Sequence, residues 1–246
     1  MENNNLGGSL RYIRSMFCVF LVLVFSTNTL ASETPSNLTN VKVQLKWRHQ
    51  FQFAGFYAAI EQGYYRDVGL DVTLIERELG PTPIEKIILG EVDYAVGGVG
   101  ALIYRSNGVP LVALAATFQH SPSVLFSRYP ALSDLKMKKI MLSRGVMNAE
   151  IITMLERENI IKEDFFLIPS NQSLEGFIEG KHDAYNGYVT NELYFLQQQN
   201  IPFYMFNPKD YNIDFYGDIL LTTENKLTNN LEQTQNFTNA TIKGWQ

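Results

Sequence analysis

The chain has 246 residues, a formal net charge of −5 and no run of basic side chains. Nucleic-acid binding needs a basic surface, so this composition argues against that class of protein. Hydrophobic residues make up 46% of the chain and charged residues 18%. This balance argues against a disordered protein and is typical of a globular chain with a substantial core.

Residues 1–31 have the pattern of a secretory signal peptide. Arg11 and Arg14 precede an apolar stretch, Met16–Phe25, and small residues flank a cleavage position before Ser32. The apolar stretch is well short of the ~20 residues that cross a bilayer, so an uncleaved membrane anchor is the weaker alternative. We expect cleavage and a periplasmic protein.

The single cysteine, Cys18, lies inside that apolar stretch. A mature chain would therefore have neither disulfides nor cysteine metal ligands. The three histidines, His49, His120 and His182, fall in separate segments, without a carboxylate or cysteine at the spacing of a metal site. We expect no metal, no cofactor and no catalytic residue.

The segment 41–75 predicts a βαβ unit. Polar and apolar residues alternate over 41–46, which predicts a strand, and apolar residues then recur every three or four positions over 56–64, which predicts a helix. Gly69 ends the helix, and alternation resumes in a second strand. The loop 47–53 should lie at the carboxyl edge of a sheet, where open α/β proteins bind ligands.

A helix from Pro83 to Gly90 and a strand at 91–96 follow, and the strand leads into the glycine cluster 97–100. Such a cluster between a strand and a helix gives a ligand access to backbone N–H groups, although a tight packed turn explains it equally well. The continuous apolar run 110–117 predicts a parallel strand covered on both faces.

The second half of the chain repeats this alternation of helices and strands. Extended structure is expected at Val124–Phe126, and the elements after it are Ile140–Leu142 (strand), Asn148–Glu158 (helix), Phe165–Ile168 (strand), Leu174–Ile178 (helix), Ala184–Tyr188 (strand), Asn191–Gln199 (helix), Phe203–Phe206 (strand) and a return strand, Tyr216–Leu221. Two such halves predict an α/β chain of two lobes with a cleft between them.

We expect the following boundaries: a flexible lead-in at 32–40, lobe I at 41–120, lobe II at 121–212 and an incomplete return to lobe I at 213–246.

Three motifs carry a family resemblance: LKWxxQxQFAGFYAAxxxGYYxxxGLDV from Leu45, QHSP at 119–122 and GYVTNELY at 187–194. From Val41 to Trp245 the chain resembles the periplasmic solute-binding proteins that include the sulfonate binder SsuA and ThiY, which binds a thiamine pyrimidine precursor. The resemblance implies a two-lobed periplasmic-binding-protein fold of type II, with the ligand in the cleft. Relatives continue with further helices, so we expect truncated C-terminal helices.

The resemblance also indicates how Glu192 could serve a ligand. Tyr188 ends a strand and Thr190 or Asn191 can cap the next helix, so Glu192 falls in the first turn, where the helix dipole favours a carboxylate. That position alone explains the residue structurally. A carboxylate at a cleft rim can also accept paired hydrogen bonds from an aminopyrimidine.

Aromatic side chains would stack on such a ligand, and polar groups of the crossover loop would bond it. His120 could instead bond only backbone. The expected ligand contacts are Trp47, Gln52, Phe53, Tyr57, Gly98, Val99, Gln119, His120, Ser121, Tyr188, Asn191 and Glu192. An anionic ligand such as a sulfonate would need basic groups, for which Arg48 and Arg144 are the weaker candidates.

The resemblance implies a monomeric protein that binds a small pyrimidine-like ligand for the permease of an ABC transporter. One alternative is a sensor domain, because similar domains form the outer parts of bacterial membrane kinases and diguanylate cyclases, with a fused signalling module as partner. A minor alternative is a thiamine pyrimidine synthase. Its cofactor lysine and donor histidine would fall at Gly97 and Ala101, which cannot do that chemistry.

Overall fold

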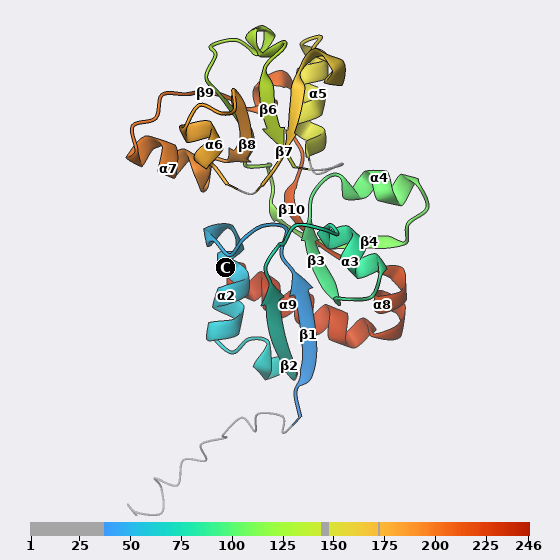
Figure 1. Cartoon of the computed structure of the whole chain (residues 1–246). Helices are drawn as coiled ribbons and strands as arrows, with labels where there is room; N and C mark the ends of the chain where they lie inside the picture. Colours follow the sequence, from blue (N-terminus) through green and yellow to red (C-terminus); the bar gives the residue numbers. More distant parts are fainter. Residues whose placement is uncertain (1–36, 144–147, 172) are drawn as a thin grey trace, which may run out of the picture. The chain divides into compact units, whose positions relative to one another are not determined.

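The computed structural model describes residues 37–143, 148–171 and 173–246. The expected signal peptide and Arg144 lie outside these ranges. The described chain forms two five-stranded sheets with helices against them, an α/β architecture (Figure 1). Within these ranges, no helix is both long and apolar enough to cross a membrane.

The first sheet has the strand order β2-β1-β3-β10-β4. Its strands are β1 (Thr39–Gln44), β2 (Leu70–Ile75), β3 (Tyr94–Gly97), β4 (Leu111–Phe118) and β10 (Gly217–Thr223). Strand β1 is parallel to β2 and β3, whereas β10 runs antiparallel to both of its neighbours, β3 and β4. The last strand of the chain therefore lies inside the sheet that the first strands begin.

The helices that come before and after the strands of the first sheet follow the predicted alternation of helices and strands. They are α2 (Ala54–Glu61), α3 (Pro83–Ile88), α4 (Ala101–Ser106), α8 (Glu224–Asn229) and α9 (Leu231–Trp245), with short 3-10 turns η1 (Phe51–Phe53) and η2 (Arg66–Val68). Gly69 ends η2 with φ of 77°, the left-handed conformation that the sequence suggested. A capping box between Thr82 and Glu85 begins α3.

The second sheet has the order β7-β6-β8-β5-β9. Its strands are β5 (Ser123–Ser127), β6 (Lys139–Leu142), β7 (Phe166–Pro169), β8 (Ala184–Tyr188) and β9 (Tyr204–Phe206), and its helices are α5 (Ala149–Arg157), α6 (Glu175–Ile178) and α7 (Glu192–Gln198), with 3-10 turns η3 (Leu132–Leu135), η5 (Lys162–Asp164) and η6 (Pro208–Tyr211). Strand β6 is parallel to β7 and β8, and β5 is antiparallel to β8 and β9.

The expectation that residues 110–117 form a parallel strand is wrong. Strand β4 is the edge of the first sheet and runs antiparallel to β10. The apolar run is nevertheless continuous, because Leu111 belongs to one buried cluster while Leu114 and Ala115 pack against another. An unbroken apolar run indicates that both faces are covered, and it does not indicate the direction of the neighbouring strand.

The core of the first sheet includes side chains of the C-terminal helix. Phe237 of α9 stacks on Tyr94 of β3, with ring centroids 4.0 Å apart, and on Tyr65 at 5.4 Å. Helix α9 also packs along α2, which directly follows the loop after β1 (Figure 1). The position of that loop therefore depends on residues at both ends of the described chain.

Candidate ligand-binding site

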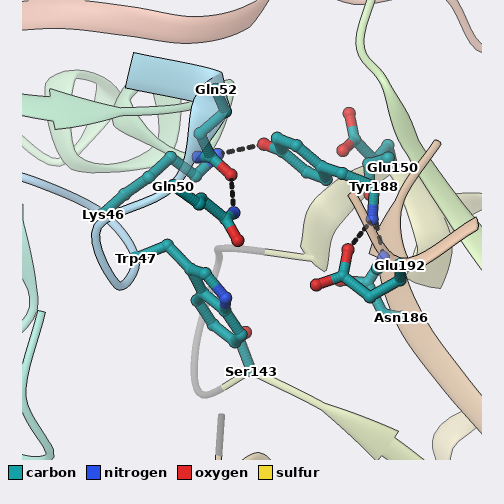
Figure 2. A pocket seen from close by; sticks show the side chains of 11 residues that line it. Lys46, Trp47, Gln50, Gln52, Ser143, Glu150, Asn186, Tyr188 and Glu192 are labelled. Carbon is teal, nitrogen blue, oxygen red and sulfur yellow. Dashed lines mark hydrogen bonds between the residues drawn. The ribbon is translucent and has the colours of Figure 1, made fainter. Parts of the chain in front are cut away.

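One pocket collects polar and aromatic side chains from both sheets (Figure 2). It lies where β1, β6 and β8 end, and its empty space, counting the open mouth, is about 450 Å³. The residues that line it are Lys46, Trp47, Gln50, Gln52, Ser123, Ser143, Glu150, Asn186, Gly187, Tyr188 and Glu192. Carboxyl ends of strands are where α/β proteins commonly bind ligands, which agrees with the prediction for the loop 47–53.

A buried carboxylate, Asp218, joins residues from distant parts of the chain beside this pocket. Its side chain is 1% exposed and lies 3.0 Å from the Lys46 ammonium. The Tyr188 hydroxyl donates to it at 2.9 Å and the Gln52 amide at 3.1 Å. Asp218 lies in β10 of the first sheet, and Tyr188 ends β8 of the second sheet. These bonds therefore join the loop after β1 to both β8 and β10.

The ion pair fixes the charge of Lys46. Burial alone would lower the pKa of this ammonium, but the Asp218 carboxylate and the Tyr188 hydroxyl outweigh burial, so the pKa lies above its usual value. The Lys46 ammonium also donates to Tyr188. Burial raises the pKa of the Tyr188 phenol, and the charge of Asp218 raises it further. Lys46 is therefore a cation already held by a carboxylate.

Glu192 lies in the first turn of α7, as predicted, and its carboxylate reaches back to the end of β8. The backbone N–H of Tyr188 donates to it at 2.6 Å and the Asn191 amide at 2.9 Å. Burial raises the pKa of Glu192, although these hydrogen bonds oppose the shift. A Cβ on Gly187 would lie 2.9 Å from the Glu192 carboxylate, so the glycine makes room for this side chain.

Glu150 is a second buried carboxylate, from the first turn of α5. Its side chain accepts a hydrogen bond from the Ser121 hydroxyl at 2.9 Å. Burial raises its pKa, while the charge of Lys46 and the hydroxyls of Ser121 and Ser123 oppose that shift. Ser123 in turn accepts a bond from the Asn186 amide at 2.9 Å.

Trp47 and Gln50 face these carboxylates from the loop after β1 (Figure 2). The Gln50 amide bonds Gln52, which is itself bonded to Asp218. Trp47 is half-buried and packs against the first core with part of its ring, leaving the remainder to line the pocket. The pocket thus has an aromatic wall on one side and the acidic side chain of Glu192 on the other.

Four of the expected ligand contacts line the pocket, namely Trp47, Gln52, Tyr188 and Glu192. A fifth, Asn191, is bonded to the Glu192 carboxylate. Gly98 lies beside this group, because a Cβ on it would be 3.5 Å from the Lys46 ammonium nitrogen. Val99 is half-buried in the turn that precedes α4.

The other expected contacts lie outside the pocket lining. Phe53 is fully buried in the first core, and the Tyr57 hydroxyl bonds His49. The Gln119 amide donates to the Ala116 carbonyl at 3.1 Å.

His120 and Ser121 occupy the crossover between β4 and β5. The His120 ring pairs with the exposed carboxylate of Asp214 at 2.9 Å. Ser121 contributes only through its bond to Glu150, which does line the pocket.

Sequence reasoning missed Lys46, Glu150 and Asp218. In the sequence Lys46 is only one of the polar positions in the alternation over 41–46, which gives no sign of a buried ion pair. Glu150 lies in the first turn of α5, as Glu192 lies in the first turn of α7, which is a usable signal. Asp218 is the second residue of β10 and directly precedes the apolar residues Ile219–Leu221, and an isolated carboxylate in that setting indicates a buried partner. The described residues contain no group of three or more metal-ligating side chains that could hold an ion.

Solved structures with this architecture identify the class. A Candida albicans protein described as having the generic periplasmic binding protein fold matches 84% of this chain and 71% of its own, at 20% identity and a TM-score of 0.62. The alkanesulfonate-binding protein SsuA of Xanthomonas axonopodis pv. citri matches 85% of this chain and 74% of its own, at 15% identity and a TM-score of 0.63. The chain has the periplasmic binding protein fold.

Sequence comparison defines the family more closely. The chain belongs to the NMT1/THI5-like family, whose sequence model matches residues 50–246. A formylaminopyrimidine-binding protein of Halalkalibacterium halodurans is 24% identical over 97% of this chain and 74% of its own length. A Haemophilus influenzae protein named as a thiamine biosynthesis protein is 25% identical over 76% of this chain and 63% of its own length. These matches confirm the family resemblance seen in the sequence.

Proposed function

We propose that this protein is an extracytoplasmic solute-binding protein that takes an aminopyrimidine, most simply a thiamine pyrimidine precursor, into the pocket beside Trp47. The names of the two sequence relatives support the ligand class. The proposal includes export to the periplasm, a monomeric state and delivery of the ligand to an ABC importer.

The observation that carries the ligand class is the pairing of Trp47 with Glu192 across one pocket. A flat heteroaromatic ring gains about 0.5 to 1.5 kcal/mol from a good aromatic contact beyond the area that it buries. An aminopyrimidine with a protonated ring nitrogen presents two N–H donors side by side, and a carboxylate accepts both. Glu192 is held in place for this role by Tyr188 and Asn191.

The charge of the pocket disfavours an anionic ligand. Of the described side chains that line it, Lys46 is the only cation, and Asp218 already holds it. Glu150 and Glu192 are both acidic. A sulfonate would need unshared donors or a free cation, and it would meet two carboxylates instead.

A synthase reaction is disfavoured by the packing at Gly97. The lysine of that reaction would have to occupy this position, and even a Cβ there would lie 2.5 Å from the Leu221 side chain. Without an amine no Schiff base with a carbonyl cofactor can form. The proposal is therefore a binding protein without catalysis.

Calorimetric titration with an aminopyrimidine panel tests the proposal. Glu192→Gln replaces one acceptor oxygen by a donor and should weaken binding by about 1.5 to 3 kcal/mol, the scale of a charge-assisted hydrogen bond. Its melting temperature without ligand should hardly move, because the amide oxygen can still accept from the Tyr188 N–H and the Asn191 side chain can turn its own oxygen towards the new NH2 group. Trp47→Ala should cost a similar amount of affinity, roughly 2 kcal/mol, through lost stacking and burial.

Phe51→Ala is the matched control for Trp47→Ala, since Phe51 lies in the same loop with 81% of its surface exposed. Its affinity should equal that of the wild type. If no pyrimidine binds the wild type, the proposed function fails. If Glu192→Gln binds normally but melts several degrees lower, Glu192 is a structural residue of the helix start.

A further inference from the structure

The structure assigns Glu150 as a second ligand-binding carboxylate, and we propose that the preferred ligand is an aminopyrimidine whose side arm ends in a protonated amine. In this arrangement Glu192 bonds the ring edge and Glu150 bonds the ammonium of the arm. The inference rests on the proposed function and adds the chemistry of the arm to it.

The position of Glu150 is the first argument. Its side chain is 7% exposed and yet lines the same pocket as Glu192. Both carboxylates come from the first turn of a helix, α5 and α7, and these helices follow two neighbouring strands, β6 and β8. Glu150 lies behind Tyr188, and Glu192 lies beside Asn186 (Figure 2). Because both carboxylates line this one pocket, we infer that a single small ligand meets Glu192 at its ring and Glu150 at its arm.

Charge balance is the second argument. Lys46 and Asp218 neutralise each other at 3.0 Å. Of the remaining described lining residues, only Glu150 and Glu192 are charged. Their contacts are with hydroxyl, amide and backbone N–H donors, all of which are neutral. The charge of Lys46 also reaches Glu150, but among the described residues neither Glu150 nor Glu192 has an ion-pair partner of its own. Buried carboxylates are normally paired, and a cationic ligand would supply that partner.

The groups around Glu150 fit an ammonium better than a neutral arm. Ser121 already donates to one oxygen of the carboxylate. An ammonium adds up to three N–H donors and a full positive charge, whereas a hydroxyl adds a single neutral donor. A formylated amine also keeps an N–H, but it loses the charge and brings a carbonyl oxygen towards a carboxylate.

Three probes separate these possibilities by calorimetry on the same full chain: an aminopyrimidine with an aminomethyl arm, its N-formyl derivative and its hydroxymethyl analogue. The wild type should bind the amine roughly 10- to 100-fold more tightly than either neutral probe, the range of a charge-assisted bond. Glu150→Gln should remove that preference by weakening the amine alone. Glu156→Gln, an exposed carboxylate on the same helix, should leave all three affinities unchanged.

The wild-type ranking tests the inference even if a variant folds poorly. Equal or tighter binding of a neutral probe by the wild type overturns it, and so does a Glu150→Gln variant that weakens all three probes alike. In both cases pyrimidine binding itself, and hence the proposed function, stands. Absence of binding to all three probes refutes the proposed function and the inference together.

Discussion

At the scale of single residues, burying the charged carboxylates of Glu150 and Glu192 lowers the stability of the folded protein. Each is more than nine-tenths buried, and burial raises the pKa of each carboxyl group. A folded state with a raised carboxyl pKa binds more protons than the unfolded state between the two pKa values. The contribution of such a group to stability therefore falls as pH rises through that window.

This gives a prediction for the ligand-free protein. Glu150→Gln imitates the protonated side chain at every pH, so it should be at least as stable as the wild type at neutral pH. The advantage should shrink as pH falls towards the ordinary glutamate pKa of 4.5, where the wild-type side chain becomes protonated. Lys46 and Asp218, the charged groups that face Glu150, are the same in both proteins.

Urea unfolding at several pH values gives the free energy of unfolding of the wild type and of the variant. The contributions of the other titrating groups are the same in both proteins and cancel in the difference. A variant that is clearly less stable than the wild type at neutral pH, with no change in the difference on acidification, would show that the Glu150 charge supports the fold.

Single residues also show which parts of the site could be predicted from the sequence and which could not. The first-turn position of Glu192 follows from local pattern, because a strand end, a capping residue and a helix start lie within five positions. The partners of Asp218 do not follow from any local pattern, since Gln52 lies 166 positions away in the chain. Only the sheet topology brings these two side chains together.

At the scale of elements, the ion pair between the loop after β1 and the start of β10 should contribute strongly to stability. Asp218→Asn removes the carboxylate and leaves the Lys46 ammonium, which is 13% exposed, without its ion-pair partner. We expect a loss of about 3 kcal/mol in the free energy of unfolding, near the lower end for a broken buried pair because Lys46 keeps some contact with water. Urea denaturation measures it.

Two further variants isolate the cause. Glu224→Gln breaks an ion pair with Arg105 in which both side chains are about half exposed, and it should change stability by about 0.5 kcal/mol or less. Adding Lys46→Met to Asp218→Asn removes the unpaired charge and should restore part of the lost stability. If the double variant is as unstable as Asp218→Asn, the loss comes from the other hydrogen bonds of Asp218.

Most elements could be predicted from periodicity, and the exceptions have physical reasons. Strand β3 begins at Tyr94 rather than Glu91. The Asp93 carboxylate before it accepts the Lys42 N–H and pairs with Lys226, contacts that the sequence pattern does not reveal. Strand β4 has the apolar pattern of a central parallel strand although it is an antiparallel edge. Pattern reports how a strand is covered, whereas pairing depends on which segment arrives beside it.

At the scale of the whole described chain, the same β10 has a consequence for the order of folding. It lies between β3 and β4 in the sheet, and its residue Leu221 pairs with Ala95 of β3. All strands of the second sheet lie between these two residues in the sequence. The pairs of the second sheet are closer in sequence, as with Lys139 and Phe166 of β6 and β7. Contacts that close long loops cost more entropy and tend to form later.

We therefore expect pulse-labelling hydrogen exchange during refolding to protect amides of β6 and β7 before those shared by β3 and β10. Earlier protection of β3 and β10 would contradict this order. If the chain is delivered from its N-terminus, all strands of the second sheet arrive before the first sheet can receive β10. Until then β3 and β4 have no partner between them, and such unpaired strand edges are prone to aggregation.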